Sequence, residues 1–581
     1  MREIRTSIRC AAFLLAGVAA SAAPALAQAP DQPGALQVET KLYNYGDQAA
    51  QLDRFPIRVE LKGSVTYPRG LPGGPYPILV FLHGRHATCM IDAPKQGQRP
   101  DSLQWPCPQG ARPIESYQGY GYLGQFLASH GYIVVSISAN GINAADGYVL
   151  DLGAAARAQL IDRHLIRWHE LSTKGGEPFG NEFLGKVDFT RVGTMGHSRG
   201  GEGVLFHYLF NRGLNRPFTI RAVLPLAPMN QRRSTIAGVP FGIILPYCDG
   251  DLSDLPGVHY YDAARYAQPG DPAPKYYFLM MGANHNFFNT TWSPSSRIPG
   301  SFDDWQVAGD PFCGSGQASR RFNEQKQRRL GLVYMSMFFR AHVGGEQRFA
   351  PFLQGSSRPI ADQRDDDVLV AYHAPDSRAV RYDLNRLQDA RYMKRNSVGG
   401  AVQIEQIETA DMCGGGERQF ATCLPREPIT RQPHNTPSDV LLAPEAKGLN
   451  VLRLGWQGGG GRFVNELPQE RADISGYQWL QFRAALNYAD ARNQNAARDF
   501  SVRIVDQDGK SASARVSQHS RALSFPPGQS RDTPKVVLTT ARIPLSAFQG
   551  VDLKRAKSVE FVFDSSPSGA IFLSDIALVR L

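Results

Sequence analysis

One pentapeptide, Gly196-His197-Ser198-Arg199-Gly200, constrains the fold of this chain more than any other feature. The segment Thr190–Met195 precedes it and indicates a short buried strand, and residues 200–210 indicate a helix that opens on small residues. A glycine on each side permits the strained strand-to-helix turn that exposes a serine between them. The chain holds 57 glycines, so the pattern can also arise by chance, and the neighbouring segments must decide its meaning.

Apolar runs alternate with longer helical segments from about residue 37 to residue 345. Near-continuous apolar strands interleaved with helices predict a mostly parallel sheet that is covered on both faces, which is an α/β fold. The predicted strands are 58–67, 77–82, 132–138, 190–195, 222–226, 241–246 and 275–281, and the predicted helices are 117–130, 148–171, 200–210 and 320–342.

The composition changes after Gly345. A polar, charged stretch suits a linker at 351–367, and short alternating runs separated by turn signals follow it. We therefore predict a catalytic domain at 28–350 and an all-β jelly-roll sandwich at 368–581. Its predicted strands are 368–372, 450–455, 479–485, 500–506, 536–543, 558–563 and 570–579.

The N-terminus carries the pattern of a secretory signal peptide. Arg2, Arg5 and Arg9 form a basic start, residues 11–23 are apolar, and Ala25-Leu26-Ala27 gives a small-x-small cleavage pattern. We expect residues 1–27 to be removed and the chain to be exported, as a periplasmic or secreted protein. No later apolar run reaches the roughly 18 residues that a membrane span needs.

The net charge of +10 is dispersed along the chain. No dense Lys/Arg run and no nucleic-acid module pattern accompany it, so we expect no nucleic-acid partner.

Six cysteines follow the predicted signal peptide. An even number in an oxidising compartment favours disulfides over metal ligation, and none of the spacings is C-x-x-C. Proximity along the chain favours the pairs Cys89–Cys107 and Cys413–Cys423, which leaves Cys248–Cys313.

A serine hydroxyl needs a base to remove its proton and an acid to orient that base. With a serine in a strand-to-helix turn, the partners should follow along the chain as Asp or Glu and then His, each after a strand. His285 directly follows the apolar run 275–281 and precedes two phenylalanines, so it is the predicted base.

The acid is predicted among three carboxylates that follow the run 241–246. Asp251 lies a few residues past the strand end, where the acid commonly falls; Asp249 is the near rival and Asp254 a distant third. Such a cluster could instead bind calcium, but an EF-hand loop counted from Asp249 would place Asp at its sixth position and Tyr at its twelfth. The EF-hand interpretation therefore fails, and an irregular calcium site stays open as an alternative.

Two backbone N–H groups should stabilise the oxyanion. One is expected from Arg199, the residue after the serine, and the other from Arg85 in His83-Gly84-Arg85, which follows the strand 77–82. Each such donor is typically worth roughly 3 kcal/mol in the transition state.

These motifs resemble the α/β-hydrolase superfamily, in the clan of cutinases and polyester hydrolases, chlorophyllases, dienelactone hydrolases and platelet-activating-factor acetylhydrolases. Residues 196–201 are similar to the chlorophyllase elbow, and 82–84 with 127–132 are similar to the start of a clan domain. The resemblance covers about 300 residues and implies an α/β-hydrolase fold. Residues 543–548 and 571–578 weakly resemble a galactose-binding or carbohydrate-binding sandwich.

The combined motifs predict a serine hydrolase that cleaves carboxylic esters, small or polymeric, through an acyl-enzyme and with no metal or organic cofactor. Amide or lactone cleavage and acyl transfer would use the same triad, so these stay open. A further alternative is an exported glycan- or polymer-binding protein whose hydrolase fold is an inactive scaffold. The C-terminal sandwich could also dock the enzyme on a glycan or polymer.

Overall fold

A computed structural model describes residues 29–232, 234–252, 255–298, 312–313, 321–413, 450–487, 490–524 and 537–581. The predicted signal peptide lies outside these residues. No helix in the described part of the chain is long and apolar enough to cross a membrane.

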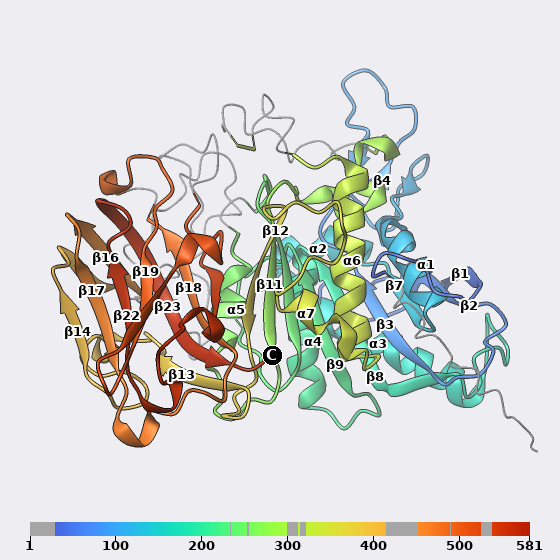
Figure 1. Ribbon diagram of the computed structural model, residues 1–581. Helices are drawn as coiled ribbons and strands as arrows, with labels where there is room; N and C mark the ends of the chain where they lie inside the picture. Colours follow the sequence, from blue (N-terminus) through green and yellow to red (C-terminus); the bar gives the residue numbers. More distant parts are fainter. Residues whose placement is uncertain are drawn as a thin grey trace, which may run out of the picture.

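A nine-stranded sheet forms the centre of the N-terminal part (Figure 1). The six middle strands of this sheet run parallel to one another. At one edge the two outermost strands each pair antiparallel with the next strand inward, and at the other edge the outermost strand does the same. The predicted mostly parallel sheet is thereby confirmed. In spatial order the strands are β1 (Val38–Asn44), β2 (Lys62–Pro68), β7 (Ile133–Ile137), β3 (Tyr76–Leu82), β8 (Val187–His197), β9 (Ile220–Leu226), β10 (Phe241–Pro246), β11 (Lys275–Met280) and β12 (Val368–His373).

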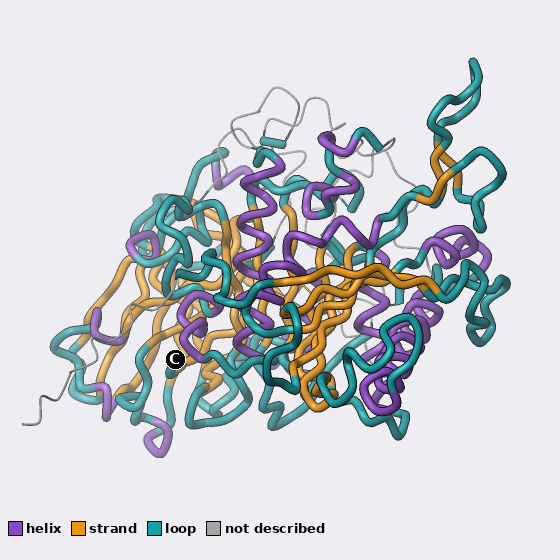
Figure 2. Tube along the Cα trace, turned by 90° about the vertical axis from the view of Figure 1, so that its right-hand side faces the viewer, coloured by secondary structure: helices purple, strands orange, loops and turns teal. Residues whose placement is uncertain are grey.

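The sheet is buried on both faces, which explains its apolar strands. Along β3, Ile78 and Val80 belong to one core, while Leu79 and Phe81 belong to the core on the opposite face. The first core includes residues of α3 (Ala154–Lys174), α4 (Arg199–Arg212) and α5 (Val258–Ala264), and the second those of α1 (Gly121–Ser129) and α6 (Glu324–His342). Figure 2 shows helices on both sides of the strands.

The predicted helix at 148–171 begins later than expected. Residues 140–145 form α2 (Asn140–Ala145), a 3-10 turn η2 (Asp146–Tyr148) follows, and α3 starts only at Ala154. Gly153 has a left-handed backbone with φ of 78°, which no continuous helix can include. A separate segment, rather than the start of α3, therefore spans residues 146–153.

Two antiparallel sheets make up the C-terminal part, coloured yellow to red in Figure 1. Side chains from both sheets, among them Leu454, Phe463 and Phe561, share one apolar core. One sheet has β15 (Thr409–Cys413), β16 (Val451–Gln457), β23 (Ser568–Val579), β18 (Trp479–Leu486) and β21 (Thr539–Pro544), with β13 (Arg381–Asn385) on β23; the other has β14 (Val402–Glu405), β17 (Gly461–Glu466), β22 (Ala556–Phe563), β19 (Ser501–Asp506) and β20 (Ser511–Arg515).

The predicted boundary between the two parts differs from the structure. The run 368–372, expected as the first strand of the sandwich, is β12, and it pairs with β11 in the nine-stranded sheet. The expected linker 351–367 includes most of a short helix, α7 (Ala350–Leu353). The sequence pattern could not reveal this, because an alternating strand at the edge of a parallel sheet looks like a strand of an antiparallel sheet.

A buried ion cluster joins the two parts. Arg483 of β18 donates to Asp262 of α5 at 2.7 Å, and Arg265 pairs with Asp575 of β23. All four side chains are at most 5% exposed, and the two positive charges match the two negative ones. The C-terminal sheets are therefore packed onto the sheet that carries the site rather than tethered to it.

We expect Arg483→Met to destabilise the whole protein. Removing one member of a balanced buried cluster leaves an uncompensated carboxylate, which typically costs about 3–5 kcal/mol. Thermal unfolding should shift down by several degrees. Arg555→Met is the matched control, because Arg555 and its partner Asp508 are both half exposed and such pairs contribute about 0–1 kcal/mol. Equal melting temperatures for the two variants would contradict the coupling.

Candidate active site

Ser198 occupies a strained turn between β8 and α4. Its φ of 57° and ψ of −122° are unfavourable for a residue with a side chain, and such strain persists only where the surroundings enforce it. A Cβ on Gly196 would lie 2.0 Å from the carbonyl oxygen of Gly200, so no larger residue fits there. The Ser198 N–H donates to the Leu226 carbonyl at 2.9 Å, which fixes the turn at the carboxyl end of the sheet.

His285 and Asp249 form a buried pair at the same edge of the sheet. His285 follows β11 and Asp249 follows β10, and His285 Nδ1 lies 2.7 Å from Asp249 Oδ2. The residues are 3% and 2% exposed. Asp249 Oδ1 also accepts the N–H groups of Asp251 at 3.0 Å and Leu252 at 2.6 Å. Contacts at both oxygens therefore hold the carboxylate in one orientation.

Asp251, the acid that the sequence favours, is not at Nδ1. Its Oδ2 lies 3.4 Å from His285 Nε2, and its side chain is 34% exposed. The loop turns at once after β10, because the Asp249 N–H bonds back to the Pro246 carbonyl at 3.1 Å. Asp249, the carboxylate closer in sequence to the end of β10, therefore contacts His285 Nδ1. Asp254 lies outside the described residues.

The His285 loop is held by α6. Gln327 is fully buried, and its side chain bonds the Asn284 backbone twice, accepting the N–H at 3.0 Å and donating to the carbonyl at 2.7 Å. The His285 backbone position is thus tied to the longest helix on that face.

His197, next to the serine, contacts the His285 ring. The two ring centroids are 4.9 Å apart, so the Ser198 turn and the His285–Asp249 pair lie side by side. Burial, and then the neighbouring His285, hold the pKa of His197 well below its usual range. Its Nδ1 lies 3.0 Å from the Tyr120 hydroxyl, and its ring is tilted against Trp292. His197 is therefore a neutral packing residue beneath the site.

The loop 83–85 passes against Ser198. A Cβ on Gly84 would lie 2.6 Å from the Ser198 Cβ, so only glycine permits this approach. His83 Nε2 lies 2.8 Å from the Ala139 N–H, and the Gly84 carbonyl accepts from the Asn143 amide at 3.0 Å. Burial lowers the pKa of His83 to about 3, so its ring is neutral and Nε2 can accept that N–H. Arg85 and Arg199, the predicted oxyanion residues, flank this contact.

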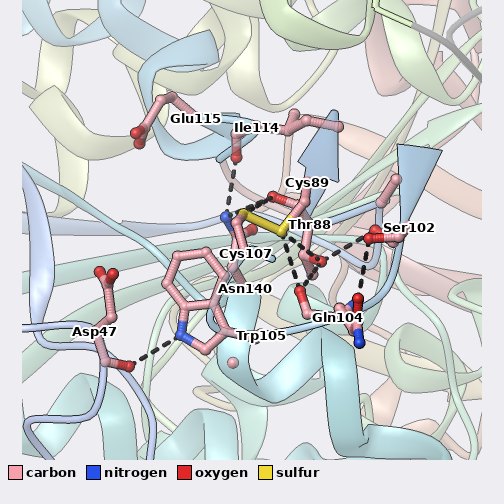
Figure 3. Close-up of a disulfide and its surroundings, with 12 residues drawn as sticks. Asp47, Thr88, Cys89, Ser102, Gln104, Trp105, Cys107, Ile114, Glu115 and Asn140 are labelled. Carbon is pink, nitrogen blue, oxygen red and sulfur yellow. Dashed lines mark hydrogen bonds between the residues drawn. A yellow bond between two sulfur atoms is a disulfide. The ribbon is translucent and has the colours of Figure 1, made fainter. Parts of the chain in front are cut away.

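Two predicted disulfides are confirmed. Cys89–Cys107 closes an insertion with a three-stranded sheet, β4 (Cys89–Met90), β5 (Asp101–Ser102) and β6 (Arg112–Pro113). Figure 3 shows Asn140 of α2 at its base, where the side-chain amide donates to the Ile114 carbonyl at 3.0 Å. Cys248–Cys313 anchors the residue before Asp249. Cys413 is disulfide-bonded, and its predicted partner, Cys423, lies outside the described residues.

The part of the chain that carries these residues is similar to known proteins. Residues 114–298 match a family model described as PETase, PET hydrolase-like, and this range holds Ser198, Asp249 and His285 but not Arg85. Over 172 residues the chain is 27% identical to cutinase est2 of Thermobifida alba. The match covers 29% of this chain and 49% of that cutinase, so the chain spans about half the length of the relative.

One feature of the site was not predicted. Asp146 of η2 contacts the side chains of both Arg85 and Arg199, and no sequence pattern indicates it. The sequence places Asp146 just before an expected helix, and neither period nor spacing relates it to Arg85 or Arg199.

Proposed function

We propose that this chain is an exported serine hydrolase that cleaves carboxylic esters through a Ser198–His285–Asp249 triad. The observation that carries the proposal is the buried His285–Asp249 pair beside the strained Ser198 turn. A strained serine after β8, a carboxylate after β10 and a histidine after β11, in this chain order, are the parts of an acyl-transfer site.

Each residue has one role in this mechanism. The Ser198 hydroxyl attacks the acyl carbon while His285 Nε2 takes its proton, and His285 later returns that proton to the leaving alcohol. Asp249 accepts a hydrogen bond from the Nδ1–H group, which keeps Nε2 unprotonated so that it can act as the base, and its charge stabilises the imidazolium. We assign the acid to Asp249 rather than Asp251, because the contact at Nδ1 is the one that fixes the tautomer.

The backbone N–H groups of Arg199 and Arg85 are the proposed oxyanion donors. Support for this comes from the position of Arg199 as the first residue of α4, directly after Ser198, and from the close packing of Gly84 on the Ser198 Cβ. Water then cleaves the acyl-enzyme, and the sequence of steps requires no metal or organic cofactor.

The wider assignments follow from the same chain. The strand order with helices on both faces supports an α/β-hydrolase fold. Two disulfides favour an oxidising compartment, in keeping with export. The C-terminal sheets are proposed to be a galactose-binding-like sandwich, and their buried ion cluster with α5 favours a stabilising role over detachable glycan docking. A complete buried His–Asp pair gives no support to an inactive scaffold.

A graded substrate panel tests the activity. We expect the purified protein to hydrolyse p-nitrophenyl esters with saturation kinetics and to be inactivated by a fluorophosphonate. Matched p-nitroanilides should react far more slowly, since the comparisons favour ester cleavage. Faster turnover of the anilides would change the assignment from esterase to amidase. Folded protein that neither hydrolyses the esters nor reacts with the fluorophosphonate would contradict the proposal.

A further inference from the structure

Three arginine side chains, one of them that of the residue after Ser198, converge on one buried carboxylate. Asp146 is fully buried, and its Oδ2 lies 2.7 Å from Arg199 Nη1 and 3.0 Å from Arg157 Nη2. Its Oδ1 lies 3.3 Å from Arg85 Nε. One negative charge therefore faces three positive charges.

No second carboxylate balances this cluster within the described residues. The three arginines form ion pairs there with Asp146 alone. The remaining contacts of Arg157 are neutral, with Nη1 donating to the Leu152 carbonyl and Nη2 to the Asn143 side chain. The neighbourhood thus carries two unmatched positive charges.

The excess charge reaches solvent at one place. The Arg157 side chain is fully buried and that of Arg199 is 12% exposed, whereas that of Arg85 is 40% exposed. Arg85 directly follows Gly84, the residue packed against the Ser198 Cβ. The exposed end of the charged cluster therefore belongs to the residue next to the Gly84–Ser198 contact.

We infer that Arg85 recognises a free carboxylate in the acyl part of the ester substrate, an inference that rests on the proposed function. The leaving alcohol must face His285, which protonates it. The carbonyl oxygen faces the N–H of Arg85, so groups on the acyl side lie within reach of the Arg85 side chain. Arg85 is thereby a specificity-determining residue, and Asp146 is the positioning residue that holds it.

The chemistry of the guanidinium favours this ligand. Its planar fork donates two parallel hydrogen bonds to a carboxylate, and such charge-assisted bonds are about twice as strong as neutral ones. A neutral apolar acyl group would instead displace water from Arg85 without replacing the lost hydrogen bonds. The preferred substrates are therefore monoesters of dicarboxylic acids.

The test compares two esters of the same shape, 4-nitrophenyl 4-carboxybenzoate and 4-nitrophenyl 4-carbamoylbenzoate. The rigid ring keeps the carboxylate from attacking its own ester. The readout is the ratio of kcat/KM for the anionic ester to that for the neutral ester, so a loss common to both cancels. We expect the wild-type ratio to exceed one and to fall as salt screens the charge.

Arg85→Gln should lower this ratio at least about tenfold, the loss expected for one charge-assisted contact. Arg85→Lys keeps the charge and should restore part of the ratio. Arg221→Gln is the control, because Arg221 is exposed at the start of β9, the opposite end of the strand from the site.

A wild-type ratio at or below one, or a ratio that Arg85→Gln leaves unchanged, would overturn the inference while the esterase assignment stands. Wild-type protein that cleaves neither ester and is not labelled by a fluorophosphonate would overturn the proposed function itself.

Discussion

Ser198→Ala is expected to lower kcat on p-nitrophenyl esters by roughly 10⁴-fold or more, because no other group can form the acyl-enzyme. The residual rate should come only from binding and oxyanion stabilisation. Labelling by a fluorophosphonate should vanish completely, since the probe reports the nucleophile itself. Initial rates and in-gel fluorescence measure the two effects on the same preparation.

Folding must be separated from chemistry in this variant. The left-handed backbone at residue 198 is strained for any residue with a Cβ, so alanine should retain the turn and the melting temperature. Ser475→Ala is the matched control, because Ser475 is exposed in the C-terminal part and its hydroxyl donates to the neighbouring Asp473 side chain. That variant should keep full activity and labelling.

Two results would contradict the assignment of Ser198. One is ester turnover by the alanine variant within about tenfold of wild type. The other is labelling that survives in Ser198→Ala, which would place the reactive serine elsewhere in the chain. Melting curves that match the wild type make either result decisive.

The parallel sheet could be predicted because its strands are buried on both faces. Runs such as Tyr76–Leu82 and Phe241–Pro246 are almost wholly apolar. A short apolar run between helical segments is typical of a strand that is buried on both faces. The serine turn could be predicted for a similar reason, since glycine at residues 196 and 200 meets a steric need that the structure displays. Burial and local steric limits therefore produce patterns that can be recognised in the sequence.

Features that depend on the path of a loop or on strand pairing produce no such sequence pattern. Asp249 and Asp251 both follow β10, and only the backbone turn at Pro246 decides which carboxylate meets His285 Nδ1. The membership of β12 in the nine-stranded sheet is likewise a matter of pairing partners, which the pattern of a single strand does not encode. The convergence of Arg85 and Arg199 on Asp146 depends on three separate segments.

Asp249→Asn is expected to lower kcat by about 10⁴-fold, the loss typical when the acid of such a triad becomes an amide. Asp251→Asn is the matched control, and its kcat should stay within about tenfold of wild type because Asp251 contacts Nε2 rather than Nδ1. Steady-state kinetics on one p-nitrophenyl ester compares them. A larger loss in Asp251→Asn would return the acid to the residue that the sequence favours.

The size of the expected loss follows from the contacts at both oxygens of Asp249. Oδ1 accepts two backbone N–H groups, so an amide at residue 249 must keep its oxygen there and turn its NH₂ toward His285. Nδ1 must then accept a hydrogen bond, which moves the imidazole proton to Nε2. An Nε2 that carries a proton cannot take one from Ser198. The variant would thus retain its fold and its serine and lose the base, and labelling by the fluorophosphonate should slow in parallel with kcat.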